Sequence, residues 1–143
     1  AIKLVAARAD LSAGLTNSGA MAAVFADYST VSAAVDQAGA ALSVAAINSP
    51  ANVVVSGDKA ALEALLEKFE GNGTASRMLN IANAFHSSFV DPILDEYEAI
   101  VAATKRSRPT LTVISNVSGD IAKADEITSA AYWRCNSHAV YRA

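Results

Sequence analysis

The sequence is poor in the residues that form disulfides and metal sites. Among 143 residues it has one cysteine, Cys135, and two histidines, His86 and His138. A lone cysteine cannot close an intrachain disulfide, and this set falls short of the four cysteine and histidine ligands typical of structural zinc. We therefore expect no disulfide and no metal. A free thiol without a disulfide framework is typical of the cytoplasm.

The chain also lacks basic clusters and long apolar runs. Its net charge is -3, and 52% of its residues are apolar, enough for the core of one or two small domains. No run of 18 apolar residues suggests a membrane span, and no basic patch suggests nucleic acid. Lys3, Arg8 and Asp10 interrupt what would be the apolar part of a signal peptide, so we expect none.

The scarcity of histidine directs attention to His86, in the stretch NIANAFHSSFVDPILDEY (80–97). Ser87 or Ser88 can cap the helix that follows, and Pro92 suits its first turn. Helical spacing predicts one buried face, formed by Val90, Ile93, Leu94, Tyr97, Ile100 and Val101. His86 therefore lies at a strand-to-helix junction, where either a structural or a functional imidazole is possible.

Between residues 19 and 81, short β-rich runs alternate with helical ones. Strands are predicted at 20–26, 42–48, 52–57 and 74–81, and helices at 28–39 and 59–71. Pro50 marks the turn of a close strand pair, and Asp58 can cap the second helix. The resulting order, β-α-β-β-α-β, is that of a ferredoxin-like split unit.

The N-terminal segment predicts a helix, because Leu4, Leu11 and Leu15 recur at helical spacing from the start of the chain. Arg8 lies on or beside this apolar stripe. Its stem can pack on the core while its head reaches water, or its guanidinium can bind an anion.

The C-terminal third predicts less regular structure. The run TLTVISNVSGD (110–120) favours a further strand that ends in a turn at Gly119. The tail from residue 129 favours a short helix, and His138 is interpreted as a surface residue.

Several stretches together resemble the acyltransferase domain of modular polyketide synthases, which is related to malonyl-CoA:acyl carrier protein transacylases. The stretches are GAMAAV, INSPANVVVSGD, AFHSSFVDPILDEY, SNVSGD and YW, in the family's order and at about its spacing. The resemblance implies an α/β fold. In it, residues 19–81 form a small ferredoxin-like subdomain, and residues 1–18 and 82–143 are part of a large α/β-hydrolase-like subdomain.

The resemblance also implies a two-step acyl transfer. A serine attacks the thioester of malonyl-CoA, and the phosphopantetheine thiol of an acyl carrier protein then takes the acyl group. His86 matches the general base of both steps, and Arg8 matches the arginine that clamps the malonyl carboxylate. No bound cofactor and no metal is implied.

Phe85 matches the residue that borders the α-carbon of the extender unit. A phenylalanine there accompanies malonyl use in the family, so we expect malonyl to be preferred over methylmalonyl. The chain departs from the family pattern at two nearby positions. Asn83 stands where malonyl-type members more often have histidine, and Ser12 stands where a larger apolar residue is common.

The nucleophile of the family is not in this sequence, which contains no G-x-S-x-G pentapeptide. In the family the serine lies upstream of the helix that carries Arg8. The expected partners are therefore the missing N-terminal part of the same acyltransferase domain, neighbouring polyketide synthase domains, acyl-CoA and an acyl carrier protein. The alternative is a non-catalytic ferredoxin-like binding or docking module, which leaves Arg8 and NAFHSSFVDP unexplained.

Overall fold

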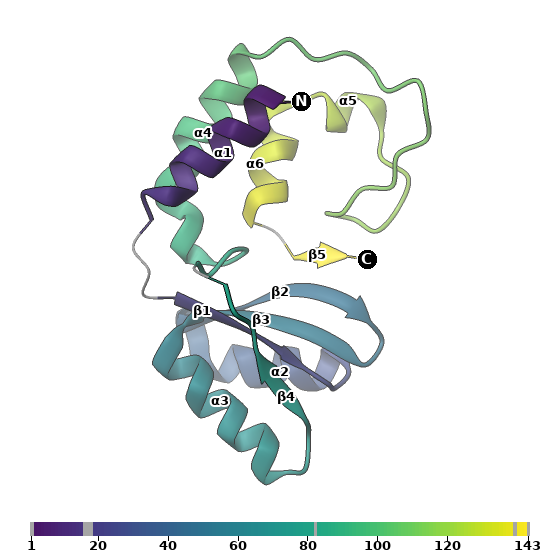
Figure 1. Ribbon diagram of the computed structural model, residues 1–143. Helices are drawn as coiled ribbons and strands as arrows, with labels where there is room; N and C mark the ends of the chain where they lie inside the picture. Colours follow the sequence, from purple (N-terminus) through teal and green to yellow (C-terminus); the bar gives the residue numbers. More distant parts are fainter. Residues whose placement is uncertain (1, 16–18, 82, 139, 143) are drawn as a thin grey trace.

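The computed structural model describes residues 2–15, 19–81, 83–138 and 140–142. They form a mixed α/β structure with a helical part and a sheet part (Figure 1). The helices are α1 (Ile2–Ala13), α2 (Tyr28–Ala38), α3 (Lys59–Gly71), α4 (Asp91–Ala103), α5 (Ala124–Ile127) and α6 (Ala130–His138), with short 3₁₀ turns η1 (Gly39–Ala41) and η2 (Ser88–Val90). The strands are β1 (Gly19–Val24), β2 (Leu42–Ser49), β3 (Asn52–Asp58), β4 (Ser76–Met78) and β5 (Tyr141–Arg142).

The sheet has the strand order β4-β1-β3-β2-β5. The first four strands pair antiparallel, and β5 pairs parallel to β2. The sequence order β1-α2-β2-β3-α3-β4 is the predicted one. Strand β4 is shorter than expected, because the chain turns after Leu79, whose amide still bonds to the Met21 carbonyl at 2.8 Å.

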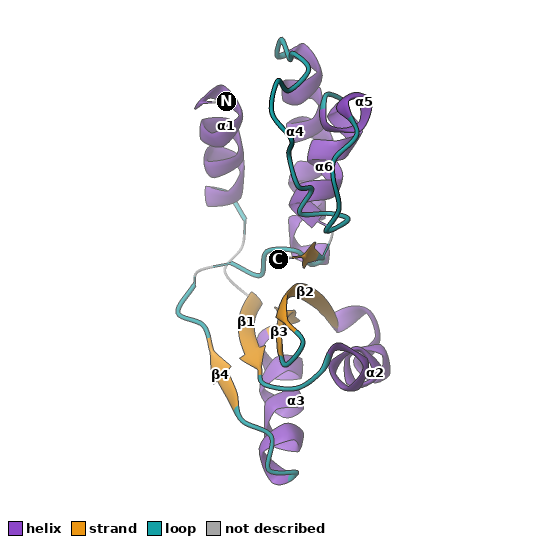
Figure 2. Cartoon of the chain, turned by 90° about the vertical axis from the view of Figure 1, so that its right-hand side faces the viewer, coloured by secondary structure: helices purple, strands orange, loops and turns teal. Residues whose placement is uncertain are grey.

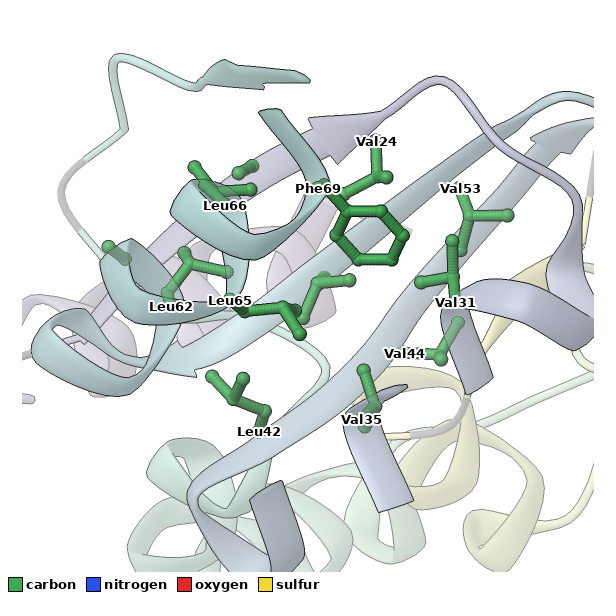
Figure 3. Close-up of a cluster of buried hydrophobic side chains, with 13 residues drawn as sticks. Val24, Val31, Val35, Leu42, Val44, Val53, Leu62, Leu65, Leu66 and Phe69 are labelled. Atoms are coloured by element: carbon green, nitrogen blue, oxygen red, sulfur yellow. The ribbon is translucent and has the colours of Figure 1, made fainter. Parts of the chain in front are cut away.

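Helices α2 and α3 cover one face of the sheet and build the main core (Figure 3). Each begins at an aspartate whose carboxylate accepts a backbone hydrogen bond: Asp27 from Thr30 at 3.0 Å and Asp58 from Ala61 at 2.9 Å. These bonds satisfy amides that a helix start leaves without a partner. The predicted apolar face of α3 is buried and consists of Leu62, Leu65, Leu66 and Phe69.

Helices α1, α4 and α6 form the helical part, which lies on the opposite side of the sheet from α2 and α3 (Figures 1 and 2). Its small core consists of Leu4, Tyr97 and Val101, with Leu11, Ile100, Ala130 and Trp133 packed around them. Polar contacts join α6 to α4: Arg134 forms ion pairs with Asp95 and Glu98, and Nε2 of His138 lies 3.2 Å from Asp91.

The prediction of a strand within residues 110–120 is wrong. In its place the structure has one isolated bridge, between Ile114 and Ile121, around the predicted turn at Gly119. A strand needs a neighbouring strand for its backbone groups. This segment lies away from the sheet (Figure 1), so its β-branched residues form only a local turn that the Ser115 hydroxyl supports by accepting from Val117 at 3.2 Å.

Large apolar side chains are exposed at several places. In α1, Ile2 is 86% and Val5 is 63% exposed, and around the 110–120 turn Leu111 is 80% exposed. Exposed apolar side chains of this kind are typical of surfaces that bind other protein segments. No helix among the residues that the structure describes is long and apolar enough to cross a bilayer.

Candidate active site

His86 lies in a tight turn between β4 and η2, at the junction that the sequence predicted. Its backbone has φ 58°. Among the residues that the structure describes, it is the one residue other than glycine with a positive φ. Few residues other than glycine adopt this backbone conformation, which persists only where the surrounding structure enforces it. The turn sets the direction of the Cα–Cβ bond from which the half-buried imidazole extends.

Hydrogen bonds within the turn enforce that backbone. The Phe85 amide donates to the Asn83 carbonyl at 3.1 Å, and the Ser87 hydroxyl donates to the Ala84 carbonyl at 2.6 Å. Ser87 also caps η2 by accepting from the Phe89 amide at 3.4 Å. The predicted cap is thus present, and it lies directly after the histidine.

The turn is also pressed against the start of β1. A Cβ placed on Gly19 would lie 2.3 Å from the Cβ of Ala84, which is 2% exposed. Such a distance is far inside van der Waals contact, so only glycine permits this approach. Gly19 therefore allows the sheet and the His86 turn to lie side by side.

A cavity of about 460 Å³ lies between the helical part and the sheet. It is lined by Val5, Arg8, Ala9 and Ser12 from α1, Met21 from β1, Phe85 and His86 from the turn, Val90 and Ile93 from the next turn and helix, and Ser137 from α6. The structure thus brings the three predicted site residues, Arg8, Phe85 and His86, to one cavity. Its size suits a small-molecule group.

Arg8 reaches this cavity from the middle of α1. Leu4, one turn earlier, is buried against Tyr97 and Val101 and so anchors the helix. Among the residues that the structure describes, no carboxylate forms an ion pair with Arg8. Its charge acts on Tyr97: burial raises the pKa of the Tyr97 phenol, and the Arg8 charge partly offsets that rise. The guanidinium therefore remains available to an anion.

Phe85 belongs to both the cavity wall and the protein interior. It packs on a cluster formed by Met21, Ala45 and Val54 on the face of the sheet opposite α2 and α3. The same side chain lines the cavity. Because the cluster packs against one side of the ring, the rotamer of Phe85 is held in place where the ring lines the cavity.

Sequence reasoning missed several lining residues, of which Met21 and Ser137 are the most informative. Met21 alternates with Ala20 and Ala22, which face the main core, so period-two alternation could have assigned it to the opposite face. Ser137 comes from the tail, and no local pattern indicates its place. Its hydroxyl donates to the Trp133 carbonyl at 3.1 Å.

The remaining reactive side chains lie elsewhere. His138 is exposed, as predicted, and does not line the cavity, while Cys135 is exposed on α6. In the described ranges no three histidine, cysteine, aspartate or glutamate side chains are grouped as metal ligands would be.

Comparison with known proteins assigns the chain to a family. The acyl transferase domain family model matches residues 1–142, and the chain belongs to this family. Among curated proteins it is 40% identical over 133 residues to polyketide synthase GfsA of Streptomyces halstedii, covering 93% of this chain and 2% of GfsA. It is 41% identical over 131 residues to mycoketide-CoA synthase of Mycobacterium tuberculosis, covering 92% of this chain and 3% of that protein.

Solved structures agree with the family assignment. The acyltransferase domain from the second module of the salinomycin polyketide synthase superposes with a TM-score of 0.91 at 34% identity, covering 98% of this chain and 32% of that one. Malonyl CoA-acyl carrier protein transacylase from Burkholderia pseudomallei gives a TM-score of 0.85 at 26% identity, covering 99% of this chain and 48% of that one. The chain thus spans a small fraction of its curated relatives and less than half of these solved chains.

Proposed function

We propose that this chain forms part of the acyltransferase domain of a polyketide synthase. The domain transfers a malonyl-type extender unit from acyl-CoA, through an acyl-serine, to the phosphopantetheine thiol of an acyl carrier protein. The observation that carries the proposal is the shared cavity, which combines a histidine base and an arginine cation with an aromatic wall. A base and a fixed cation are what acyl transfer from a carboxylated thioester requires.

His86 is proposed as the general base. In the first step it takes the proton of the serine hydroxyl as the oxygen attacks the thioester carbonyl carbon. The tetrahedral intermediate then collapses, the C–S bond breaks, and the proton passes to the departing thiolate of coenzyme A. In the second step His86 takes the proton of the carrier protein's thiol, whose sulfur attacks the carbonyl carbon of the acyl-serine. The C–O bond to the serine then breaks, and His86 gives the proton to the departing serine oxygen.

Arg8 is proposed as the clamp for the substrate's free carboxylate. A planar guanidinium can donate two parallel hydrogen bonds to a carboxylate, which fixes the orientation of the extender unit. The absence of an ion-pair partner for Arg8 within the described part of the chain supports this role. The carboxylate would lie at the α1 side of the cavity and the thioester at the His86 side.

The nucleophilic serine and its oxyanion-hole donors are proposed to come from residues upstream of α1. The sequence contains no G-x-S-x-G pentapeptide, and the exposed Ile2 and Val5 offer α1 surface to further structure. In this proposal residues 19–81 are a small ferredoxin-like subdomain. Residues 1–18 and 82–143 are then part of a larger α/β-hydrolase-like subdomain, and neighbouring polyketide synthase domains and an acyl carrier protein are the partners.

The function is tested by incubating the complete acyltransferase domain, and separately this chain, with malonyl-CoA. Mass spectrometry should find one malonyl group on the complete domain and none on the isolated chain, which lacks the nucleophile. A malonylated serine in the isolated chain would place the nucleophile within these 143 residues. A complete domain that never becomes acylated would favour the non-catalytic binding module.

Phe85 is proposed to select malonyl over methylmalonyl, because its supported ring occupies the space that a branching methyl needs. One methyl group in a packed pocket changes discrimination by roughly 1 to 3 kcal/mol. Phe85→Ser in the complete domain should therefore raise the methylmalonyl-to-malonyl loading ratio by roughly 10-fold. The ratio is measured by mass spectrometry with both acyl-CoAs present in equal amounts.

Phe89→Ser is the matched control for this substitution. Phe89 is also half-buried and lies four residues away, but it does not line the cavity with Arg8 and His86. Its loss should leave the ratio near that of the parent. An unchanged ratio in Phe85→Ser, or an equal change in both variants, would remove Phe85 from the specificity site.

A further inference from the structure

Asn83 connects two segments of the candidate active site that are far apart in the sequence. Its amide nitrogen Nδ2 donates to the carbonyl oxygen of Ser12 at 3.2 Å, across 71 residues of sequence. That carbonyl lies at the C-terminal end of α1 and also accepts from the Leu15 amide at 3.2 Å. Carbonyl groups in the last turn of a helix have no partner within the helix. The Ser12 carbonyl takes one donor from the residues just after α1 and a second, Asn83, from a distant segment.

The backbone of Asn83 belongs to the turn that carries His86. Its carbonyl accepts the Phe85 amide at 3.1 Å, which starts the turn. One residue is thus bonded through its side chain to the helix of Arg8 and through its backbone to the turn of Phe85 and His86. Asn83 does not itself line the cavity, whereas Ser12, Phe85 and His86 do.

The other end of the Asn83 side chain shows that packing alone does not explain this residue. Its Oδ1 is buried and has no hydrogen-bond partner among the described residues. A buried acceptor without a partner destabilises a fold, and an apolar side chain of equal size would avoid that cost. The polar amide is therefore present despite the cost of its unpaired acceptor, which draws attention to what its donor does.

We propose that Asn83 is a positioning residue that sets the spacing between the carboxylate clamp on α1 and the base in the His86 turn. The inference rests on the proposed function, since it assigns Asn83 to the same reaction. A dicarboxylic extender unit touches both groups at once, so its transfer depends on that spacing. An acetyl group touches only the His86 side and depends on it less.

The decisive variant is Asn83→Leu in the complete acyltransferase domain. Leucine has the same number of side-chain heavy atoms and the same branching at Cγ as asparagine, so it removes the donor and the unpaired acceptor without opening a cavity. The malonyl-to-acetyl ratio of kcat/KM should fall on the order of 10-fold, since a misplacement of about 1 Å can cost about 100-fold. The melting temperature should stay level or rise.

Asn83→His is the rescue variant, because the Nδ1–H of its ring can occupy the place of the amide nitrogen and donate to Ser12. It should restore the parent ratio. Asn80→Leu is the matched control: Asn80 is exposed, three residues earlier, and outside the cavity. It should match the parent in both ratio and melting temperature.

A second readout follows the hydrogen bond between Asn83 and Ser12 directly. Hydrogen exchange at the Leu15 amide, which shares the Ser12 carbonyl, should be faster in Asn83→Leu than in the parent and in Asn83→His. An unchanged malonyl-to-acetyl ratio in Asn83→Leu, or no recovery in Asn83→His, would overturn the positioning role. If the parent fails to transfer malonyl groups, the proposed function fails. The exchange comparison then still decides whether Asn83 holds α1, and unchanged exchange overturns the inference.

Discussion

His86→Ala in the complete acyltransferase domain should abolish acyl transfer from every acyl-CoA, dicarboxylic or not. A serine hydroxyl is almost entirely protonated near pH 7, so attack on the thioester needs a base at hydrogen-bond distance. Loss of a general base lowers rates by roughly 10²- to 10⁴-fold. The expected result is that malonyl and acetyl transfer fall together, because the base serves the reacting carbonyl and not the rest of the acyl group.

The measurement is the single-turnover rate of acyl-enzyme formation with malonyl-CoA and, separately, with acetyl-CoA. Both rates should fall together in His86→Ala, because the base acts on the serine whichever acyl group is transferred. His138→Ala is the control. His138 lies outside the cavity and contacts Asp91 on α4, so its loss should leave both rates unchanged. A His86→Ala enzyme that retains the parent's rates would exclude His86 as the base.

The sheet and its two covering helices could be predicted because several local signals agree there. Asp58 stands before a run with apolar residues at helical spacing, and β-branched runs flank the turn at Pro50. Each signal involves only a few neighbouring residues, and the structure contains the helix and the strands that these signals predict. The strand expected at 110–120 had only β-branched composition in its favour. Pairing is not local, and in this structure Ile114 meets only Ile121 across a turn.

The site could be predicted only in part, for a related reason. Phe85 and His86 adjoin in the sequence, but their expected roles required the family resemblance, as did that of Arg8. The residues alone left open a structural imidazole at His86 and a stem-packing role for Arg8. Met21 and Ser137 line the cavity and Asn83 bonds to Ser12 only because distant segments meet in the fold. Periodicity indicates which face is buried but not what that face contacts.

The α1 helix illustrates this limit. Its repeat of leucines predicts a helix with one packed face, and Leu4 is indeed buried. The same pattern cannot indicate that Ser12, at the end of the helix, receives a hydrogen bond from Asn83. The sheet unit, which begins at Gly19, lies between Ser12 and Asn83 in the sequence. The contact forms only when this unit folds, so that the chain returns after Leu79 to the helical part.

Arg8→Ala should separate substrates that His86→Ala does not. Hydrogen bonds to charged groups contribute about 1.5 to 3 kcal/mol, and each 1.4 kcal/mol is tenfold. The paired bonds of a guanidinium to a carboxylate should therefore give a loss on the order of 100-fold in kcat/KM for malonyl-CoA. Acetyl-CoA has no free carboxylate, so its transfer should be unchanged or improved.

Two further variants sharpen this test of the clamp. Arg8→Lys keeps the charge but offers a single point donor, so malonyl transfer should recover only in part. Lys3→Ala removes a cation from the exposed side of the same helix, outside the cavity, and should change neither substrate. The kcat/KM values are measured for malonyl-CoA and acetyl-CoA with each enzyme. If Arg8→Ala lowers both values equally, the arginine supports the fold of α1 and does not hold the carboxylate. A loss confined to malonyl-CoA means that the guanidinium acts on the charge distinguishing the two substrates, because that carboxylate is the chemical difference between the acyl groups.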